Sequence, residues 1–160
     1  MSKSLTFGEA IVATAKQKRD AASARSSPVT SGQADKPRDV ILSACEAIAD
    51  QLRQDGFCFV KSGPKLKRVR GDRVFTIWFQ SDRNNVAGRR AAVWIHAGVQ
   101  KVGSTSFIAG GQIGNLLPEA TWMEWDFADE EARRSEINDA VAAIRRIVLP
   151  FFAPFENRTT

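Results

Sequence analysis

The sequence predicts an α+β fold, with a mostly antiparallel, curved sheet of about five strands and helices before and after it on one face. Three observations predict this fold. Within residues 37–160, a helix-forming stretch at 37–52 comes first, several short apolar runs separated by turn residues follow, and another helix-forming stretch spans 128–149. Helices that flank a run of strands, rather than alternate with single strands, are typical of an α+β domain.

The length and composition fit one folded domain preceded by a tail. The chain has 160 residues, of which 43% are hydrophobic and 26% charged, enough for one core but too few for two comfortable domains. No run approaches the roughly 18 apolar residues of a membrane span, and Glu9 interrupts the one candidate for a signal peptide, Leu5–Ala15. We therefore expect a cytoplasmic protein that does not enter a membrane.

Residues 1–36 are expected to form an extra helix and a flexible linker ahead of the single domain at 37–160. Thr6–Arg25 starts with a capping-box pattern, in which a threonine precedes a glutamate by three residues, and continues with alanine, lysine and glutamine. Its apolar side is thin, so this helix would form only against the domain or a partner. Ser26–Lys36 has the serine, proline and glycine content of a linker.

The first helix of the domain is predicted between Pro37 and Gly56. Its apolar residues recur at three- and four-residue steps, proline is favoured in a first helical turn, and glycine is favoured just beyond a helix end. Strands are expected next at Phe57–Lys61 and Lys65–Arg70, the second with an almost entirely basic surface. The dipeptide Gly71-Asp72 then fits a two-residue type II′ hairpin turn.

Two apolar strands and the polar loop Ser81–Arg90 between them form the centre of the chain. A period of two gives each strand one core face. The residues of these core faces are Phe75, Ile77 and Phe79 in the first strand and Val93, Ile95, Ala97 and Val99 in the second. If the strands pair across the loop, the opposite face gathers Trp78, Gln80, Trp94 and His96. Either a helix or a second copy of the chain covers this face, or it is an open aromatic surface for a partner.

The C-terminal third is predicted to add one strand and one helix. The strand is expected at Thr105–Ala109, followed by a flexible glycine-rich connection at Gly110–Asn115 and an aromatic segment at 120–127 that could be strand or irregular. A helix is predicted at 128–149, because acidic residues open it and arginines close it. Pro150 should end this helix. Three phenylalanines would then form a tailpiece that packs back on the domain: Phe151, Phe152 and Phe155.

The sequence contains no recognisable catalytic or metal-binding motif. His96 is the only histidine and lies in the middle of a strand, where a structural role is more common than a catalytic one. Cys45 and Cys58 lack the CxxC spacing of metal or redox sites and are expected to be buried thiols. We therefore expect neither an enzyme nor a site for a metal or a cofactor.

Positive charge is concentrated in the middle of the chain. Residues 61–101 contain ten lysines and arginines against two aspartates, a local charge of +8. Basic residues beside aromatic ones suit a nucleic-acid backbone and its bases, although basic edge strands also prevent aggregation. Nucleic-acid binding through a basic β-hairpin is thus an alternative function. Its candidate contacts are Lys65, Lys67, Arg68, Arg70, Arg89 and Arg90.

Four short motifs between residues 39 and 155 follow one another in a recognisable order. They are a helix leading into Asp55-Gly56-Phe57, a basic hairpin at Lys61–Arg70, Phe79-Gln80-Ser81 with Asn84-Asn85 and Gly88, and a final helix closing on Leu149-Pro150-Phe151-Phe152. This succession resembles a widespread bacterial domain family of unknown function. The resemblance leaves out the N-terminal helix and the linker.

The resemblance implies a bacterial cytosolic binding protein without catalytic residues. Some members of the family look like accessory proteins encoded near toxin–immunity or phage-defence genes. The leading expectation is therefore a non-catalytic protein-interaction module, an accessory or immunity-type component of such a system. Its partner would be another protein or a second copy of the chain. The expected partner-binding residues are Trp78, Gln80, Trp94 and His96.

Overall fold

The structure, a computed structural model, describes residues 34–156. Its strands are β1 (Cys58–Val60), β2 (Lys65–Arg70), β3 (Arg73–Ser81), β4 (Ala92–Lys101), β5 (Phe107–Gln112) and β6 (Trp125–Asp126). Its helices are α2 (Pro37–Leu52), α3 (Glu130–Ala143) and α4 (Leu149–Glu156), with 3₁₀ turns at Arg53–Asp55 and Ile113–Leu116 and a π-helical turn at Ile144–Val148. The predicted N-terminal helix and the linker up to residue 33 lie outside the described residues.

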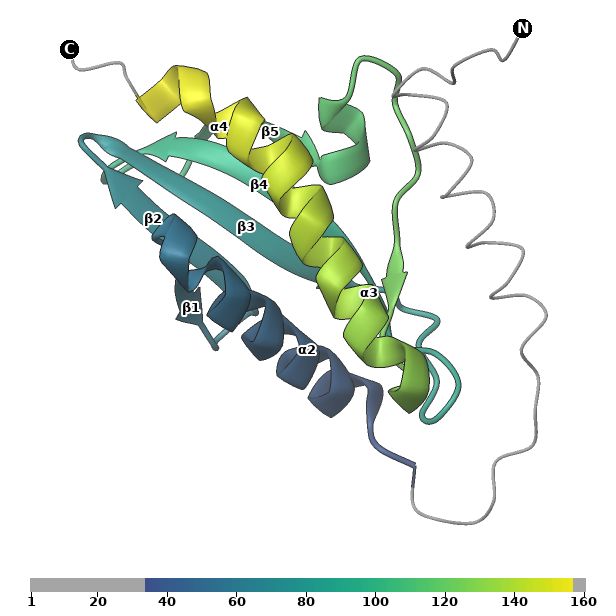
Figure 1. Ribbon diagram of the computed structural model, residues 1–160. Helices are drawn as coiled ribbons and strands as arrows, with labels where there is room; N and C mark the ends of the chain where they lie inside the picture. Colours follow the sequence, from purple (N-terminus) through teal and green to yellow (C-terminus); the bar gives the residue numbers. More distant parts are fainter. Residues whose placement is uncertain (1–33, 157–160) are drawn as a thin grey trace, which may run out of the picture.

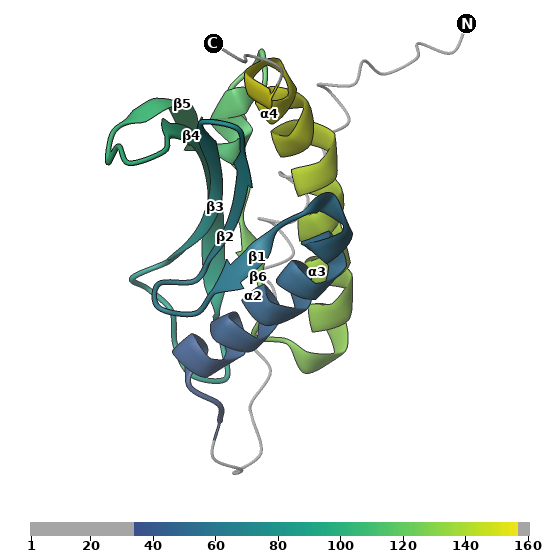
Figure 2. The ribbon, with the colours of Figure 1, turned by 90° about the vertical axis from the view of Figure 1, so that its left-hand side faces the viewer.

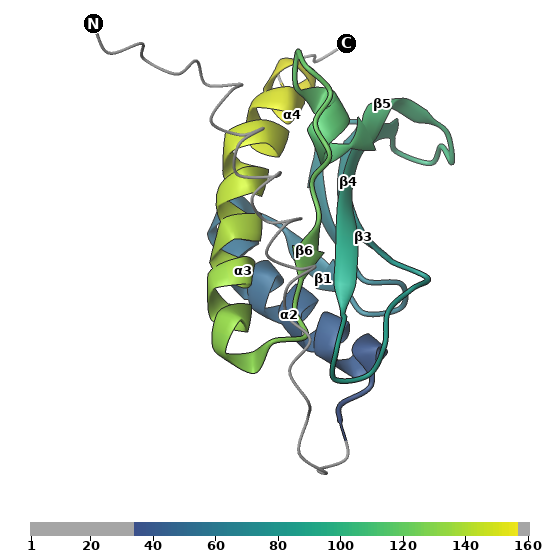
Figure 3. The same cartoon turned by 90° about the vertical axis from the view of Figure 1, so that its right-hand side faces the viewer.

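The strands form one antiparallel sheet in the order β1-β2-β3-β4-β5, and β6 pairs with the beginning of β4. Helix α2 lies over the β1–β2 side of this sheet, and α3 and α4 run diagonally across β3 and β4 (Figure 1). The two side views show all three helices on the same side of the sheet, with β6 between β4 and α3 (Figures 2 and 3). The predicted α+β class, with helices on one face, is confirmed.

The hydrophobic core lies between the sheet and the helices. The predicted core faces of the two central strands are confirmed, because every residue assigned to them is buried. These residues are Phe75, Ile77, Phe79, Val93, Ile95, Ala97 and Val99. The helices contribute Ile48, Leu52, Ile144, Val148 and Phe152, each fully buried. Within residues 34–156, no helix has both the length and the apolar content that crossing a bilayer requires.

Helix α2 has the boundaries that its proline and glycine predict. Pro37 occupies the first turn, where its missing N–H has no intrahelical partner to lose. Gly56 ends the 3₁₀ extension of the helix with a φ of 84°, in the left-handed region that glycine adopts without strain. The chain then turns directly into β1.

The prediction that Pro150 ends the last helix is wrong. The helix continues from α3 through the π-helical turn Ile144–Val148 into α4, which ends at Glu156. Proline normally interrupts a helix, because it lacks an N–H and its ring crowds the carbonyl four residues earlier. The π-helical turn ends at Val148, two residues before Pro150, and includes Arg146, the residue whose carbonyl the proline ring would crowd in an α-helix. Phe152 therefore reaches the core from a helix, with its ring centroid 5.0 Å from that of Phe75.

Residues 110–112 of the glycine-rich segment lie in the sheet and residues 113–115 in a 3₁₀ turn, which corrects the expected flexible connection at 110–115. Gly110 and Gly111 lie in β5, opposite Gly98 and Ala97 of β4. A Cβ atom on Gly110 would stand 2.4 Å from the Ala97 carbonyl oxygen. Glycine is required here because the two backbones approach closely. Composition alone does not distinguish a glycine with this role in a strand from a glycine in a loop.

Candidate functional site

The sheet face opposite the helices carries the four residues predicted to bind a partner. Strands β3 and β4 pair in a register that sets Trp78 directly across from His96 and Gln80 across from Trp94. Figure 2 shows α2, α3 and α4 on the other side of the sheet, so none of these helices covers this face. The predicted shared patch is confirmed as an arrangement in space, and its role in binding stays a prediction.

The ring of Trp78 contacts two other rings on this face. Its centroid lies 5.1 Å from that of His96 and 5.2 Å from that of Phe107, and both pairs are stacked. Phe107 is 48% exposed and takes the space above Gly98, where a Cβ atom would stand 2.4 Å from the ring. Sequence reasoning missed Phe107, because a register shift between Val99 and Gln100 turns it onto this face.

A second pair of rings extends the face toward β6. Trp94 meets Trp122 edge to face, with ring centroids 5.2 Å apart, and its Nε1 donates a hydrogen bond of 3.3 Å to Glu124. Trp122 is 44% exposed. Sequence reasoning did not place Trp122 here, because only the tertiary pairing of β6 with β4 brings residues 120–124 alongside Trp94. We call Trp78, Trp94, Phe107 and Trp122, with His96 between them, the aromatic face.

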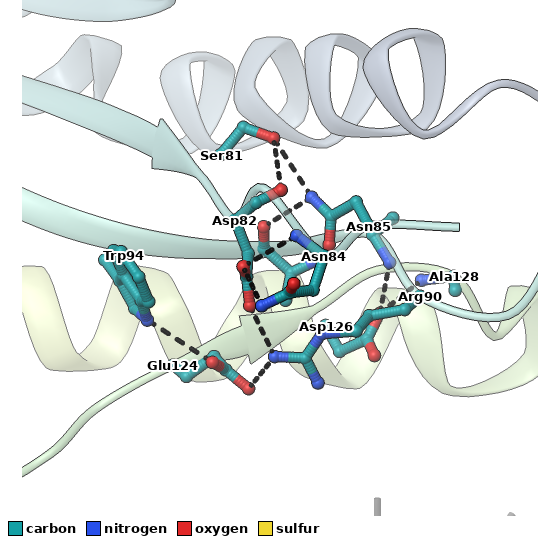
Figure 4. Close-up of polar contacts among 11 residues, drawn as sticks. Ser81, Asp82, Asn84, Asn85, Arg90, Trp94, Glu124, Asp126 and Ala128 are labelled. Atoms are coloured by element: carbon teal, nitrogen blue, oxygen red, sulfur yellow. Dashed lines mark hydrogen bonds and ion pairs between the residues drawn. The ribbon is translucent and has the colours of Figure 1, made fainter. Parts of the chain in front are cut away.

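An ion-pair network closes one end of the aromatic face (Figure 4). The Arg90 guanidinium lies 2.9 Å from both the Asp82 and the Glu124 carboxylates. Asp82 is only 7% exposed and also accepts hydrogen bonds from the backbone and side chain of Asn84. The Asn84 backbone N–H and the Arg90 guanidinium hold the pKa of Asp82 below its usual value. Each of these charges has a partner inside the chain, so we assign the network a structural role.

Amide and carboxylate side chains complete the same network on the loop Ser81–Arg90 (Figure 4). Asn85 donates to the Ser81 hydroxyl and to the carbonyl of Ala92, and accepts a hydrogen bond from the Ala92 backbone N–H. Asp126 accepts from the backbone N–H groups of Ala91 and Ala128. The polar residues of this loop therefore hold the β3–β4 connection in place, and the loop positions the aromatic face without belonging to it.

The six nucleic-acid candidates do not form one surface, which corrects the expected basic surface of Lys65–Arg70. Strand alternation places Lys65 and Lys67 on the side of Trp78, and Arg68 and Arg70 on the helix side. Arg68 is only 9% exposed, and Glu156 pairs with its guanidinium. Burial lowers the pKa of Arg68. The two remaining candidates lie at the loop end, where Arg89 is exposed and Arg90 is bound in the ion-pair network.

Three buried polar atoms on the side of the sheet that carries His96 have no hydrogen-bond partner among residues 34–156. Nε2 of His96 is buried and makes no hydrogen bond to a described residue, and the same holds for Oγ1 of Thr76 and Nε2 of Gln112. Desolvation by burial lowers the pKa of His96, so its imidazole is neutral near neutral pH. A serine or cysteine nucleophile would donate a hydrogen bond to a base, and His96 Nε2 accepts none from a residue of 34–156.

The two cysteines differ in environment. Cys45 is fully buried on α2, and desolvation raises the pKa of its thiol to about 12. Cys58 is exposed on β1, so the prediction that both thiols are buried is wrong for this residue. Its place at the start of a three-residue strand explains the exposure, because β1 is an edge of the sheet that residues 34–156 form.

Comparisons of the chain with protein-family models, with curated proteins and with solved structures give no match. The resemblance to a bacterial family of unknown function therefore rests on its short motifs alone.

Proposed function

We propose that this chain is a non-catalytic protein-interaction module that holds a protein partner on its aromatic face. The observation that carries the proposal is the collection of four large rings on the one sheet face that α2, α3 and α4 leave uncovered. Single exposed apolar residues are ordinary on protein surfaces, whereas contiguous ones mark interaction sites. Tryptophan is also among the residues most enriched in binding hot spots.

The surroundings of the rings indicate the chemistry of the partner. Lys65 pairs directly with Trp78 in the β2–β3 register, and the exposed Lys67 lies two residues further along the same face. Gln80 is exposed beside Trp94. A segment with an apolar anchor and a neighbouring carboxylate would match this arrangement, because the rings would bury the anchor and the lysines would attract the charge.

The biological setting that we propose is the bacterial cytosol. There the chain would have an accessory or immunity-type role in a toxin–immunity or phage-defence system. Its support is the family resemblance of the four motifs, and the aromatic face is compatible with it because such components act by binding another protein. The biological setting and the binding activity can be tested separately, because substitutions on the aromatic face test binding whatever pathway the chain belongs to.

Purification of the tagged full chain from its native cells, followed by mass spectrometry, tests the proposal. We expect a protein that is retained by the wild type and lost with Trp94→Ala. The matched control is Val86→Ala, which truncates a 50% exposed apolar residue on the loop Ser81–Arg90. Retention that is identical for both variants, or a free monomer that turns over a small molecule, would overturn the proposal.

Nucleic-acid binding through the hairpin Lys65–Arg70 is the second candidate function. The local charge of +8 over residues 61–101 favours it. The placement of its six candidate residues on three separate surfaces argues against it, because neutralising a phosphate backbone needs cations that contact the same nucleic acid together. If the charge serves nucleic-acid binding, another set of residues has to form the contact.

A further inference from the structure

Three cations form a row across the helix side of the sheet, at the end where the turn Gly71-Asp72 joins β2 to β3. The β2–β3 register pairs Arg70 with Arg73, and the β3–β4 register pairs Arg73 with Lys101. Directly paired residues of antiparallel strands point to the same face. We call Arg70, Arg73 and Lys101 the cation row.

The cation row lies on the helix side and not on the aromatic face. Arg73 precedes the buried Phe75 by two residues, so both side chains leave β3 on the same side. Nη2 of Arg70 lies 3.4 Å from the position that a Cβ atom of Gly56 would occupy, which places Arg70 beside the end of α2. The row and the aromatic face are therefore on opposite sides of one sheet.

The positive charge of the row is not balanced within the described chain. Asp72 lies 3.5 Å from Arg73, but the other acids at this end are occupied elsewhere: Glu156 pairs with Arg68 and Asp55 with Arg145. Arg70 and Lys101 are exposed and form no ion pair with a residue of 34–156. The Arg73 side chain between them is 17% exposed. Like charges directly opposite each other on neighbouring strands are destabilising, so the fold retains an arrangement that an external anion would relieve.

We propose that the cation row binds the phosphodiester backbone of a nucleic acid. Charge without an apolar anchor suits a ligand that presents regularly spaced anionic groups, and guanidinium groups bind phosphate in a bidentate manner. The row itself contains no aromatic residue, and the exposed ring of Phe107 pairs with Gln100 and so points to the other face. A protein partner would instead need buried anchors, which the aromatic face provides and the row does not.

This inference is independent of the proposed protein partner and changes the set of nucleic-acid contacts. Arg70 was among the residues that the sequence suggested, whereas Arg73 and Lys101 were not. Contacts to phosphate position a nucleic acid without reading its bases. The cation row should therefore bind different sequences with similar affinity, and its binding should weaken as salt rises.

The test is a fluorescence-anisotropy titration of the full chain against a labelled DNA duplex of arbitrary sequence, repeated at several salt concentrations. The triple variant Arg70→Gln, Arg73→Gln, Lys101→Gln should lose affinity by about 10-fold or more, and its salt slope should fall by roughly 2 to 3, at about 0.9 per phosphate contact. The control variant Lys65→Gln, Lys67→Gln, Arg89→Gln removes the same charge from the aromatic side and the loop, and should keep most of the affinity and the slope.

A pair of single variants keeps the test decisive if the triple variant fails to fold. Lys101→Gln and Lys67→Gln each remove one exposed lysine, from opposite faces of the sheet. The salt slope should fall by about 1 for Lys101→Gln and stay unchanged for Lys67→Gln.

Several results would overturn the inference. Equal losses for the two matched variants would mean that only the net charge matters. Absence of binding by the wild-type chain at low salt would remove the site. Competition by poly-glutamate as effective as that by unlabelled duplex would replace the nucleic acid with an acidic protein segment as the ligand. None of these results bears on the aromatic face, which the purification with Trp94→Ala tests separately.

Discussion

Arg68 illustrates how one acidic partner permits a charged side chain in the core. Its Nη1 donates a 2.9 Å hydrogen bond to the Asp55 carbonyl, its Nη2 pairs with Glu156, and its guanidinium lies 4.7 Å from the ring centroid of Phe57. A buried charge without a partner is costly, whereas a paired and hydrogen-bonded one is tolerated. Glu156, the last residue of α4, therefore links that helix to β2.

Replacing Glu156 should show how much the Arg68–Glu156 ion pair contributes to the stability of the fold. Glu156→Gln leaves the Arg68 guanidinium buried without a counter-charge, and we expect the free energy of unfolding to fall by about 1–3 kcal/mol. Urea denaturation measures it. Glu119→Gln is the control, since Glu119 is exposed and a surface substitution typically changes stability by less than about 0.5 kcal/mol. Similar losses for both variants would show that Glu156 does not hold Arg68.

His96 should make the stability of the fold depend on pH. Burial lowers its pKa in the folded chain below the ordinary 6.5, so on acidification through that value the unfolded chain takes up a proton before the folded chain does. The free energy of unfolding of the wild type should therefore fall between about pH 7 and pH 5, relative to that of His96→Gln. An equal change in the free energy of unfolding between the two pH values in the wild type and in His96→Gln would contradict this prediction, because all other titrating groups are common to both proteins.

At the scale of elements, the two adjacent glycines of β5 provide a matched pair. Gly110→Ala places a Cβ atom 2.4 Å from the Ala97 carbonyl oxygen, whereas Gly111→Ala meets nothing within 4 Å. We expect Gly110→Ala to cost about 1–3 kcal/mol, as overpacking does, and Gly111→Ala to lie within about 0.5 kcal/mol of the wild type. Thermal denaturation distinguishes them. Equal melting temperatures would mean that β5 does not approach β4 as described.

The elements that could be predicted from the sequence are those whose pattern is local. Alternation in β3 and β4 predicts the core face and the cross-strand neighbours of Trp78 and Trp94, and Pro37 and Gly56 mark the limits of the first helix. Period-two alternation in Lys65–Arg70 also predicts that its cations are divided between the two faces of the sheet. The expectation of one basic surface did not take this alternation into account.

The elements that could not be predicted depend on tertiary context. Pro150 lies in a helix that continues from a π-helical turn, and Gly110 is part of a strand only because β4 lies close by. Phe107 reaches the aromatic face through a register shift, and Trp122 through the pairing of β6 with β4. None of these four residues has a sequence neighbourhood that specifies its partner.

At the scale of the whole molecule, the four tryptophans have different environments that separate binding from folding. Trp125 is 1% exposed and donates to Asp139, whereas Trp78 and Trp94 lie half-buried on the aromatic face. Trp125→Ala should cost about 3–5 kcal/mol of stability. Trp78→Ala and Trp94→Ala should instead weaken partner binding by about 2 kcal/mol or more, with a smaller loss of stability. Thermal denaturation and partner retention should be measured on the same samples. Loss of binding without loss of stability in Trp125→Ala, or the reverse in Trp78→Ala and Trp94→Ala, would contradict the assignment.

The aromatic face and the cation row lie on opposite sides of the same sheet because all three helices pack on one side. This arrangement would let the molecule bind a protein and a nucleic acid at the same time, each through residues that the other ligand leaves free. The proposed function rests on the aromatic face.

Site-specific photo-crosslinking in native cells tests that claim most directly. Gln80 lies on the aromatic side of the sheet and Gln51 on α2, and both side chains are exposed. A photo-reactive residue at position 80 should crosslink a discrete protein partner, and Trp94→Ala in the same chain should abolish the product. The same residue at position 51 should give no such product. Crosslinking that is equal at both positions, or unaffected by Trp94→Ala, would contradict the assignment of the aromatic face as the partner-binding surface.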